Sequence, residues 1–351
     1  MNISDIARLR LRVQRLALDG DQFAKPEQVV GWLGAVQSQE YQLARWSVGQ
    51  RLKGAAASAS AVESAIASGR ILRTHILRPT WHFVLPRDIR WMMRLTGPRW
   101  APVVTRRHMQ LGIGPADYQR ALDSMTAALA GGKHLTRPEL GAAIERGGVN
   151  VDGQRLAFIV MAAETSLVLA SGSGQNYALL PQDPAESFDR DEALKQMALR
   201  YFTGHGPATI ADFTWWSTLT VADARRGIAA AGASLSKLTI EGTDYWLATD
   251  TADGPSDPSP TFHLLQGYDE YVVGYRSPRD PINLERLGPH TALNTPSWLN
   301  GLFLDGQLIG WWRRVRGKAG ASVETRLLRE LSTREKSALG QAIDRYSTFT
   351  E

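Results

Sequence analysis

The chain has 351 residues, 43% hydrophobic and 21% charged, and its 40 Lys and Arg against 35 Asp and Glu give a formal net charge of +5. This length and apolar content are typical of a globular protein with two or three domains. Because there is no cysteine, disulfides, thiolate zinc sites, iron–sulfur clusters and cysteine nucleophiles are excluded.

Hydropathy argues for a cytoplasmic protein without a membrane partner. The longest apolar run, Leu156–Ala163, is much shorter than the roughly 20 residues that cross a bilayer. The N-terminal segment lacks the apolar stretch of a secretory signal. A net charge of +5 is compatible with a nucleic-acid partner but does not require one, so the distribution of basic residues matters more than their sum.

The first part of the chain reads as helices followed by a β-hairpin. Apolar residues recur at three- and four-residue spacing in each helix, whereas the strands alternate around Arg78-Pro79. The predicted elements are helices over 3–17, from Pro26 through Gln37 and over 59–68, and strands over 71–77 and 80–85. Helices followed by a hairpin are the order of a winged helix, in which the hairpin is the wing.

The same order recurs twice. The second round has helices over 116–129, from 136 and over 152–165, with strands at 166–170 and 176–180. The third has helices over 190–203, 209–215 and 221–231, with strands at 238–241 and 245–249. A polar linker over 250–260 then leads to a β-rich end with a hairpin at Asp305-Gly306, a strand over 321–328 and a helix over 333–346.

The predicted fold class is therefore mainly α with small β-hairpins, an α+β arrangement of three tandem winged helix-turn-helix units with a C-terminal β-rich part. The expected divisions are 1–115, 116–185, 186–250 and 251–351.

Two glutamines in Gln37-Ser38-Gln39-Glu40 attract attention as a candidate site. Residues two apart do not share a helix face, so the helix must end between Gln37 and Gln39 if both are to line one site. Gln37 falls on the apolar stripe of its predicted helix, where an amide needs a partner or a cavity. On the pattern alone, ordinary surface or capping amides are the favoured interpretation.

A resemblance changes this weighing. The segments VQSQE, RILRTHILRPTWHFV, LLQGYDEYVVGYR and GLFLDGQLIGWWRR occur in an order that resembles the bacterial winged-helix DNA glycosylases of the azinomycin-resistance type. The resemblance covers essentially the whole chain. It implies three winged helices around a basic concave DNA-binding cleft, and an activity that excises alkylated purines and, in some members, unhooks interstrand crosslinks.

The resemblance also implies catalytic residues. The family signature is Gln, an aliphatic residue and Gln, which places the catalytic roles on Gln37 and Gln39, with Ser38 departing from the aliphatic middle position. A sister branch carries Gln-x-Asp, so the second Gln points to the crosslink-type branch. An N7- or N3-alkylated purine is a cationic leaving group, so a carboxamide that positions water is chemically sufficient. The lack of a carboxylate in the triplet suggests selectivity for cationic lesions.

Glu40, His82 and Asp269 are candidate supporting residues. Asp269 and Glu270 form a rival carboxylate pair, although acidic residues at such positions more often cap or pair structurally. Glu40 could orient the glutamines. His82 faces away from Trp81 on its predicted strand, where it could line the lesion site or be a hydrogen-bonded histidine of the sheet.

Basic residues supply candidate DNA contacts, although each cluster alone is usually a solvated face. The selected residues are Arg12, Arg73, Arg78, Arg106, Arg107, Arg313, Arg314 and Arg316. The family requires a β-hairpin in the DNA cleft, and we assign this role to residues 302–316, with the 71–85 hairpin as the competing choice.

The sequence thus predicts a monofunctional DNA glycosylase without cofactor or metal, monomeric and nucleoid-associated when bound. Its predicted partner is double-stranded DNA containing alkylated or crosslinked purines. A non-catalytic winged-helix DNA-binding regulator is the alternative, and a binder of a DNA-damaging natural product is a third.

Overall fold

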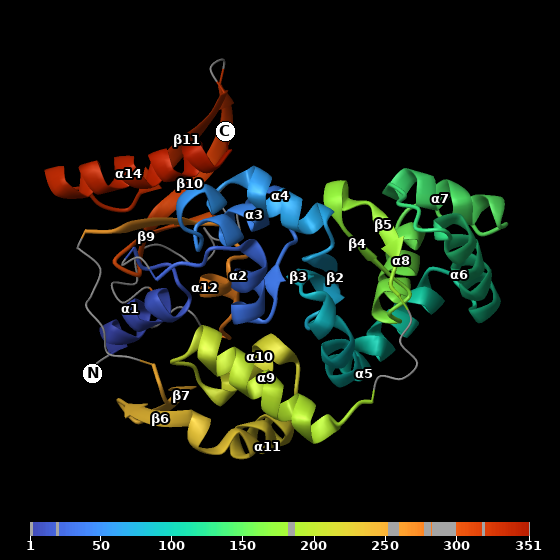
Figure 1. The fold of residues 1–351 in the computed structure, drawn as a ribbon, viewed down its shortest axis with the longest axis horizontal. Coiled ribbons are helices and arrows are strands. Elements are labelled where there is room, and N and C mark those ends of the chain that lie inside the picture. Colours follow the sequence, from blue (N-terminus) through green and yellow to red (C-terminus); the bar gives the residue numbers. More distant parts are fainter. Residues whose placement is uncertain are drawn as a thin grey trace.

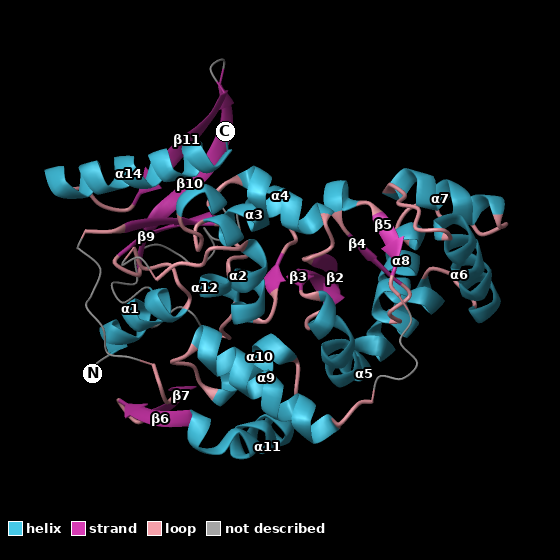
Figure 2. Cartoon of the chain, viewed as in Figure 1, coloured by secondary structure: helices cyan, strands magenta, loops and turns pink. Residues whose placement is uncertain are grey.

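The computed structural model describes residues 3–18, 21–181, 187–251, 260–276, 282, 300–317 and 320–350. It is a mixed α/β fold, mainly helical with small antiparallel sheets, as the sequence predicted (Figures 1 and 2). None of the helices in these ranges is long and apolar enough to cross a membrane.

The first region differs from the prediction around the glutamines. Its helices are α1 (Ile3–Val13), α2 (Pro26–Leu33), α3 (Tyr41–Gly49) and α4 (Ala59–Ala67). The prediction that the second helix continues through Gln37 is wrong, because α2 ends at Leu33 and Gly34 follows with a φ of 78°, a conformation that glycine adopts without a Cβ clash. Strand β1 (Val36–Gln37) follows, and α3 is a helix that the sequence reading missed.

The middle of the chain follows the predicted order, with one long addition. Its elements are the strands β2 (Leu72–Ile76) and β3 (Thr80–Val84), the helices α5 (Pro86–Gln110), α6 (Pro115–Leu129), α7 (Arg137–Arg146) and α8 (Arg155–Thr165), and the strands β4 (Leu169–Ser171) and β5 (Tyr177–Leu179). The predicted capping box of α7 is confirmed, because Thr136 and Glu139 bond each other's backbone N–H. The 25-residue α5 was not predicted.

One five-stranded antiparallel sheet, in the order β1-β3-β2-β4-β5, joins the first two hairpins. In this sheet Gln37 lies opposite His82, and His82 lies opposite Thr74 on the other side of β3. Directly opposed residues project to the same face of an antiparallel sheet, so these three side chains form a row across three strands.

The third region carries helices α9 (Arg190–His205), α10 (Ile210–Ser217) and α11 (Val221–Ala231), followed by strands β6 (Leu235–Ile240) and β7 (Thr243–Ala248). These two strands form a two-stranded sheet, and Trp246 of β7 also makes an antiparallel bridge to Ala208. Each of the three hairpins therefore follows a set of helices. The division into three winged-helix units and its boundaries stay a prediction.

The C-terminal region is β-rich, as expected. Its elements are β8 (Phe262–Leu265), α12 (Glu270–Val273), β9 (Asn300–Leu304), β10 (Gln307–Gly317), β11 (Gly320–Leu327) and α14 (Thr333–Thr350). The strands form one sheet in the order β11-β10-β9-β8, and the Asp305-Gly306 turn is confirmed by positive φ values of 50° and 83°. Most of the predicted linker, residues 252–259, lies outside the described residues.

The two ends of the chain share one hydrophobic core. The indole of Trp46 on α3 packs edge-on against Tyr346 of α14 and donates its N–H to the backbone oxygen of Leu264 on β8, at 2.7 Å. Aromatic pairs of this kind add to the free energy gained from buried area. This packing fixes β8, and the short α12 that follows it, against the region that carries β1.

Candidate functional site

The backbone and side chain of Gln37 are held by residues from two other parts of the chain. Its backbone N–H donates to Glu270 Oε1 at 2.9 Å, and its carboxamide oxygen accepts from Arg78 Nη2 at 3.0 Å. Because a guanidinium only donates, the oxygen is the atom of the carboxamide that faces Arg78. Gln37 is 5% exposed, so these bonds fix the orientation of a buried side chain.

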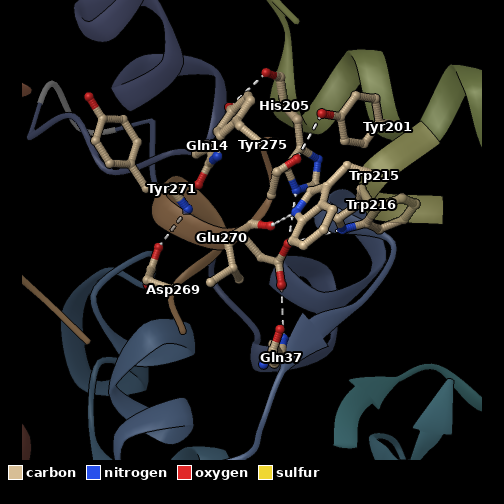
Figure 3. Close-up of polar contacts among 12 residues, drawn as sticks. Gln14, Gln37, Tyr201, His205, Trp215, Trp216, Asp269, Glu270, Tyr271 and Tyr275 are labelled. Atoms are coloured by element: carbon tan, nitrogen blue, oxygen red, sulfur yellow. Dashed lines mark hydrogen bonds and ion pairs between the residues drawn. The ribbon is translucent and has the colours of Figure 1, made fainter. Parts of the chain in front are cut away.

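Glu270 lies at the centre of this group (Figure 3). It is fully buried at the start of α12, and its second oxygen accepts from His205 Nε2 at 3.2 Å and from Trp216 Nε1 at 3.0 Å. Burial opposes ionisation, but the hydrogen bond and charge of His205, followed by the charge of Arg78, outweigh it and lower the pKa of Glu270 to about 2. The carboxylate is therefore ionised, and both of its oxygens accept hydrogen bonds.

Arg78 links the first hairpin to the third region. It sits in the loop between β2 and β3, is partly buried, and also donates to the backbone oxygen of Trp216 at 3.2 Å. Desolvation lowers its pKa from the usual arginine value. We expected Arg78 to contact a DNA phosphate, but its guanidinium instead donates hydrogen bonds to Gln37 and to the backbone of α10.

His82 stands beside Gln37 on the neighbouring strand and is fully buried. Its Nδ1 bonds the backbone oxygen of Thr80 at 2.8 Å, which assigns the proton to Nδ1 because a carbonyl only accepts. Burial first, and then the charge of Arg78, lower the pKa of His82 to about 4, so the ring is neutral at pH 7. Its Nε2 therefore carries a lone pair, which has no partner in the described part of the chain.

Of the other members of the predicted motif, Ser38 is buried, whereas Gln39 and Glu40 are exposed. Gln39 and Glu40 lie in a bend between β1 and α3, and Glu40 occupies the N-cap position of α3 without a side-chain capping bond. Residues two apart cannot share a helix face, but the chain between α2 and α3 is not helical, so this restriction does not apply to Gln37 and Gln39. Neither side chain is seen to bond Gln37 among the described residues.

Asp269 is placed differently from its neighbour Glu270. It is fully buried, caps α12 through the N–H of Tyr271, and forms a two-bonded ion pair with the buried Arg51 at 2.7 and 3.0 Å. This is the structural role that the sequence reading weighed against catalysis. The Gln-Ser-Gln triplet contains no carboxylate, but in the structure the carboxylate of Glu270 bonds the backbone of Gln37. The sequence analysis considered Glu270 only as a member of the rival pair.

The arginines chosen as DNA contacts divide by exposure. Arg73 does not face solvent: it is 3% exposed, stacks 4.3 Å from the Trp81 ring and donates to the backbone oxygen of Ser38. The buried guanidinium supports the bend before α3 and cannot reach a phosphate. Arg12, on α1, is partly buried beside a small cavity of about 180 Å³.

The remaining basic residues lie on two separate elements, α5 and β10, which stand far apart in Figure 1. Arg106 is exposed on α5, and its neighbour Arg107 is partly exposed and bonds Gln110 and Gln154. On β10, Arg314 is exposed and Arg313 pairs with Glu324 at 2.6 Å. The side chain of Arg316 lies outside the described residues.

Three site residues were not found from the sequence. His205 ends α9 and Trp216 lies on α10, and both reach Glu270. The exposed Trp215 borders them, with its ring centroid 5.7 Å from the guanidinium carbon of Arg78. No local motif marks these positions, because their role arises only from the packing of α9 and α10 against α12.

Comparisons with known proteins identify a matching family and a similar fold. The model of a family described as "DNA glycosylase AlkZ-like" matches residues 30–349. Among solved structures, a Streptomyces sahachiroi DNA glycosylase AlkZ matches with a TM-score of 0.72 and 21% sequence identity, covering 99% of this chain and 96% of that one. No curated protein matches the sequence significantly.

Proposed function

The chain belongs to the AlkZ-like DNA glycosylase family, and from that premise we propose that it is a monofunctional glycosylase that removes N7- or N3-alkylated purines from double-stranded DNA. The observation that carries the proposal is the fixation of Gln37, whose backbone is held by Glu270 and whose carboxamide is held by Arg78. A rigidly held amide is what the placement of a nucleophilic water requires.

In the proposed reaction, water attacks C1′ while the bond from C1′ to the purine nitrogen breaks. The bonding electrons pass to the cationic base, which leaves neutral, and the water retains one O–H on C1′ and releases its second proton to solvent. The carboxamide oxygen of Gln37 has a second lone pair beyond the one facing Arg78, and this accepts from the water. Gln39, exposed beside it, supplies the second contact.

Glu270 contributes through its charge. The sugar gains positive charge as the bond breaks, and a buried carboxylate behind Gln37 stabilises that charge. Because its pKa lies near 2 and its oxygens are occupied, it acts as a fixed charge and not as a general acid or base. His82, with a free Nε2 on the strand next to Gln37, is proposed as a second acceptor that orients the water.

We assign no lysine as a Schiff-base nucleophile, so the expected product is an abasic site without strand cleavage. The exposed arginines Arg106 and Arg314 are the proposed phosphate contacts. The loop of the 71–85 hairpin is packed inside the protein through Arg78, which favours the C-terminal hairpins of β9, β10 and β11 as the elements that enter DNA. Crosslinked purines remain proposed substrates together with monoadducts.

The test is a gel assay on a duplex with one N7-methylguanine, followed by alkali to cut abasic sites. The wild type should release the base, and Gln37→Ala should slow single-turnover excision by roughly 10²- to 10⁴-fold while DNA binding is kept. Gln42→Ala, which removes an exposed glutamine on α3, is the control variant. A wild type that binds the duplex and excises nothing identifies a non-catalytic DNA-binding protein instead.

A further inference from the structure

Two neighbouring tryptophans on α10 lie in opposite environments. Trp216 is fully buried and bonds Glu270, whereas Trp215 is 47% exposed. Within the described ranges, Trp215 is the largest hydrophobic side chain that is exposed. An indole joins a broad apolar face to a single N–H donor, so its face is free to pack against a partner once that donor is held.

The Trp215 ring is held in place. Its Nε1 donates to the backbone oxygen of Val273 at 3.3 Å, which ties α10 to the end of α12. In Figure 3 the indole lies beside Trp216 and Glu270. An aromatic ring whose orientation is fixed before binding loses less entropy when a partner stacks on it.

A single side chain, that of Arg78, contacts both Trp215 and Gln37. The Arg78 guanidinium that donates to the carboxamide oxygen of Gln37 at 3.0 Å has its central carbon 5.7 Å from the Trp215 ring centroid. A group positioned to react near Gln37 is therefore adjacent to an exposed and oriented aromatic face.

We propose that Trp215 is the surface on which the nucleobase of the cleaved nucleotide stacks, an inference that rests on the proposed glycosylase function. Every base offers a π-face to an aromatic side chain, and indole is the side-chain ring that most favours a positively charged partner. An alkylated purine carries that charge, so stacking on Trp215 adds preference for the lesion to the binding that phosphate contacts provide.

The experiment measures binding and excision separately. Binding is measured on a duplex with one 2′-fluoro N7-methylguanosine, which resists cleavage, and on the undamaged duplex. Excision is measured on the cleavable lesion. The variants are Trp215→Ala, the conservative Trp215→Phe, and Val221→Ala, an equally exposed apolar residue at the start of α11.

Trp215→Ala should reduce the preference for the lesion over undamaged DNA by roughly 5- to 100-fold, Trp215→Phe should retain most of it, and Val221→Ala should leave it unchanged. If Trp215→Ala leaves the preference unchanged, or weakens binding to both duplexes equally, the inference is wrong. Excision by the wild type would still support the proposed function in that case. A wild type that excises nothing contradicts the proposed function, and the inference with it.

Discussion

Glu270 accepts the backbone N–H of Gln37 at 2.9 Å, although 233 residues separate them in the chain. The same carboxylate accepts from His205 and Trp216, so α12, α9, α10 and β1 meet at one buried charge. The first and last regions of the protein are thereby joined at the residue proposed to place the water. The candidate site consequently depends on the packing of the whole chain.

Replacing Glu270 by Gln should impair both stability and excision. A carboxamide has one acceptor oxygen where the carboxylate has two, so it cannot accept all three hydrogen bonds and leaves buried donors unpaired, at a cost of roughly 2–4 kcal/mol in the free energy of unfolding. Urea denaturation measures the loss, and single-turnover excision below the transition measures activity. Glu63→Gln, which removes a carboxylate that accepts hydrogen bonds from Tyr41 and Arg45, is the control. Equal excision rates for both variants would argue against a role for the Glu270 charge.

The ion pair of Asp269 with Arg51 should behave as a structural element. Both side chains are fully buried, so removing one charge leaves the other unpaired. We expect Asp269→Asn and Arg51→Met each to lower the free energy of unfolding by roughly 3–5 kcal/mol, and the double variant to lose less than the sum. Urea denaturation of the four proteins provides the cycle. Strictly additive losses would show that the pair is not coupled.

Two buried histidines should make the protein less stable in mild acid. Burial lowers the pKa of His82 to about 4 and that of His263 to about 3, from the usual 6.5. Their contribution to stability is fully present above pH 6.5 and is lost as the pH falls towards the pKa values of the folded state. In this range the histidines of the unfolded chain bind protons, whereas the buried rings stay neutral. Between pH 8 and 5 each should cost about 2 kcal/mol.

Urea denaturation at pH 8 and pH 5 measures this loss. His263→Phe, whose site is far in sequence from Gln37, should flatten the pH dependence without the catalytic consequences expected of a change at His82. Identical stability at the two pH values would contradict the burial of neutral rings.

The exposed arginines should control the salt dependence of DNA binding. Each phosphate contact that is lost lowers the slope of log affinity against log salt by about 1. Arg106→Ala and Arg314→Ala should therefore bind undamaged and damaged DNA more weakly by the same factor. Titrations over a range of salt concentrations check this. Arg70→Ala, whose guanidinium is paired with Glu27, is the comparison, and a slope unchanged in both test variants would remove these residues from the interface.

Local patterns allowed most of the helices, the hairpins and their order to be predicted, because periodicity and turn residues act over a few positions, but α3 and α5 were missed. The end of α2 was predicted wrongly. The apolar spacing continues to Gln37, but the helix ends at Leu33 because Gly34 follows with a positive φ. Similarly, Arg73 and Arg78 were predicted to contact DNA, but Arg73 is buried in the sheet and Arg78 bonds the backbone of Trp216 on α10. The partnership of Gln37 with Glu270 could not be predicted, because it depends on how α12 docks after the core around Trp46 has formed.

The most direct test of the account is single-turnover release of N7-methylguanine from a defined duplex by the wild type and by a variant with Gln37→Ala and Gln39→Ala. The account predicts rapid release by the wild type, a loss of roughly 100-fold or more in the double variant, and equal affinity of both for the duplex. Release that is unchanged in the double variant would contradict the proposed role of the glutamines.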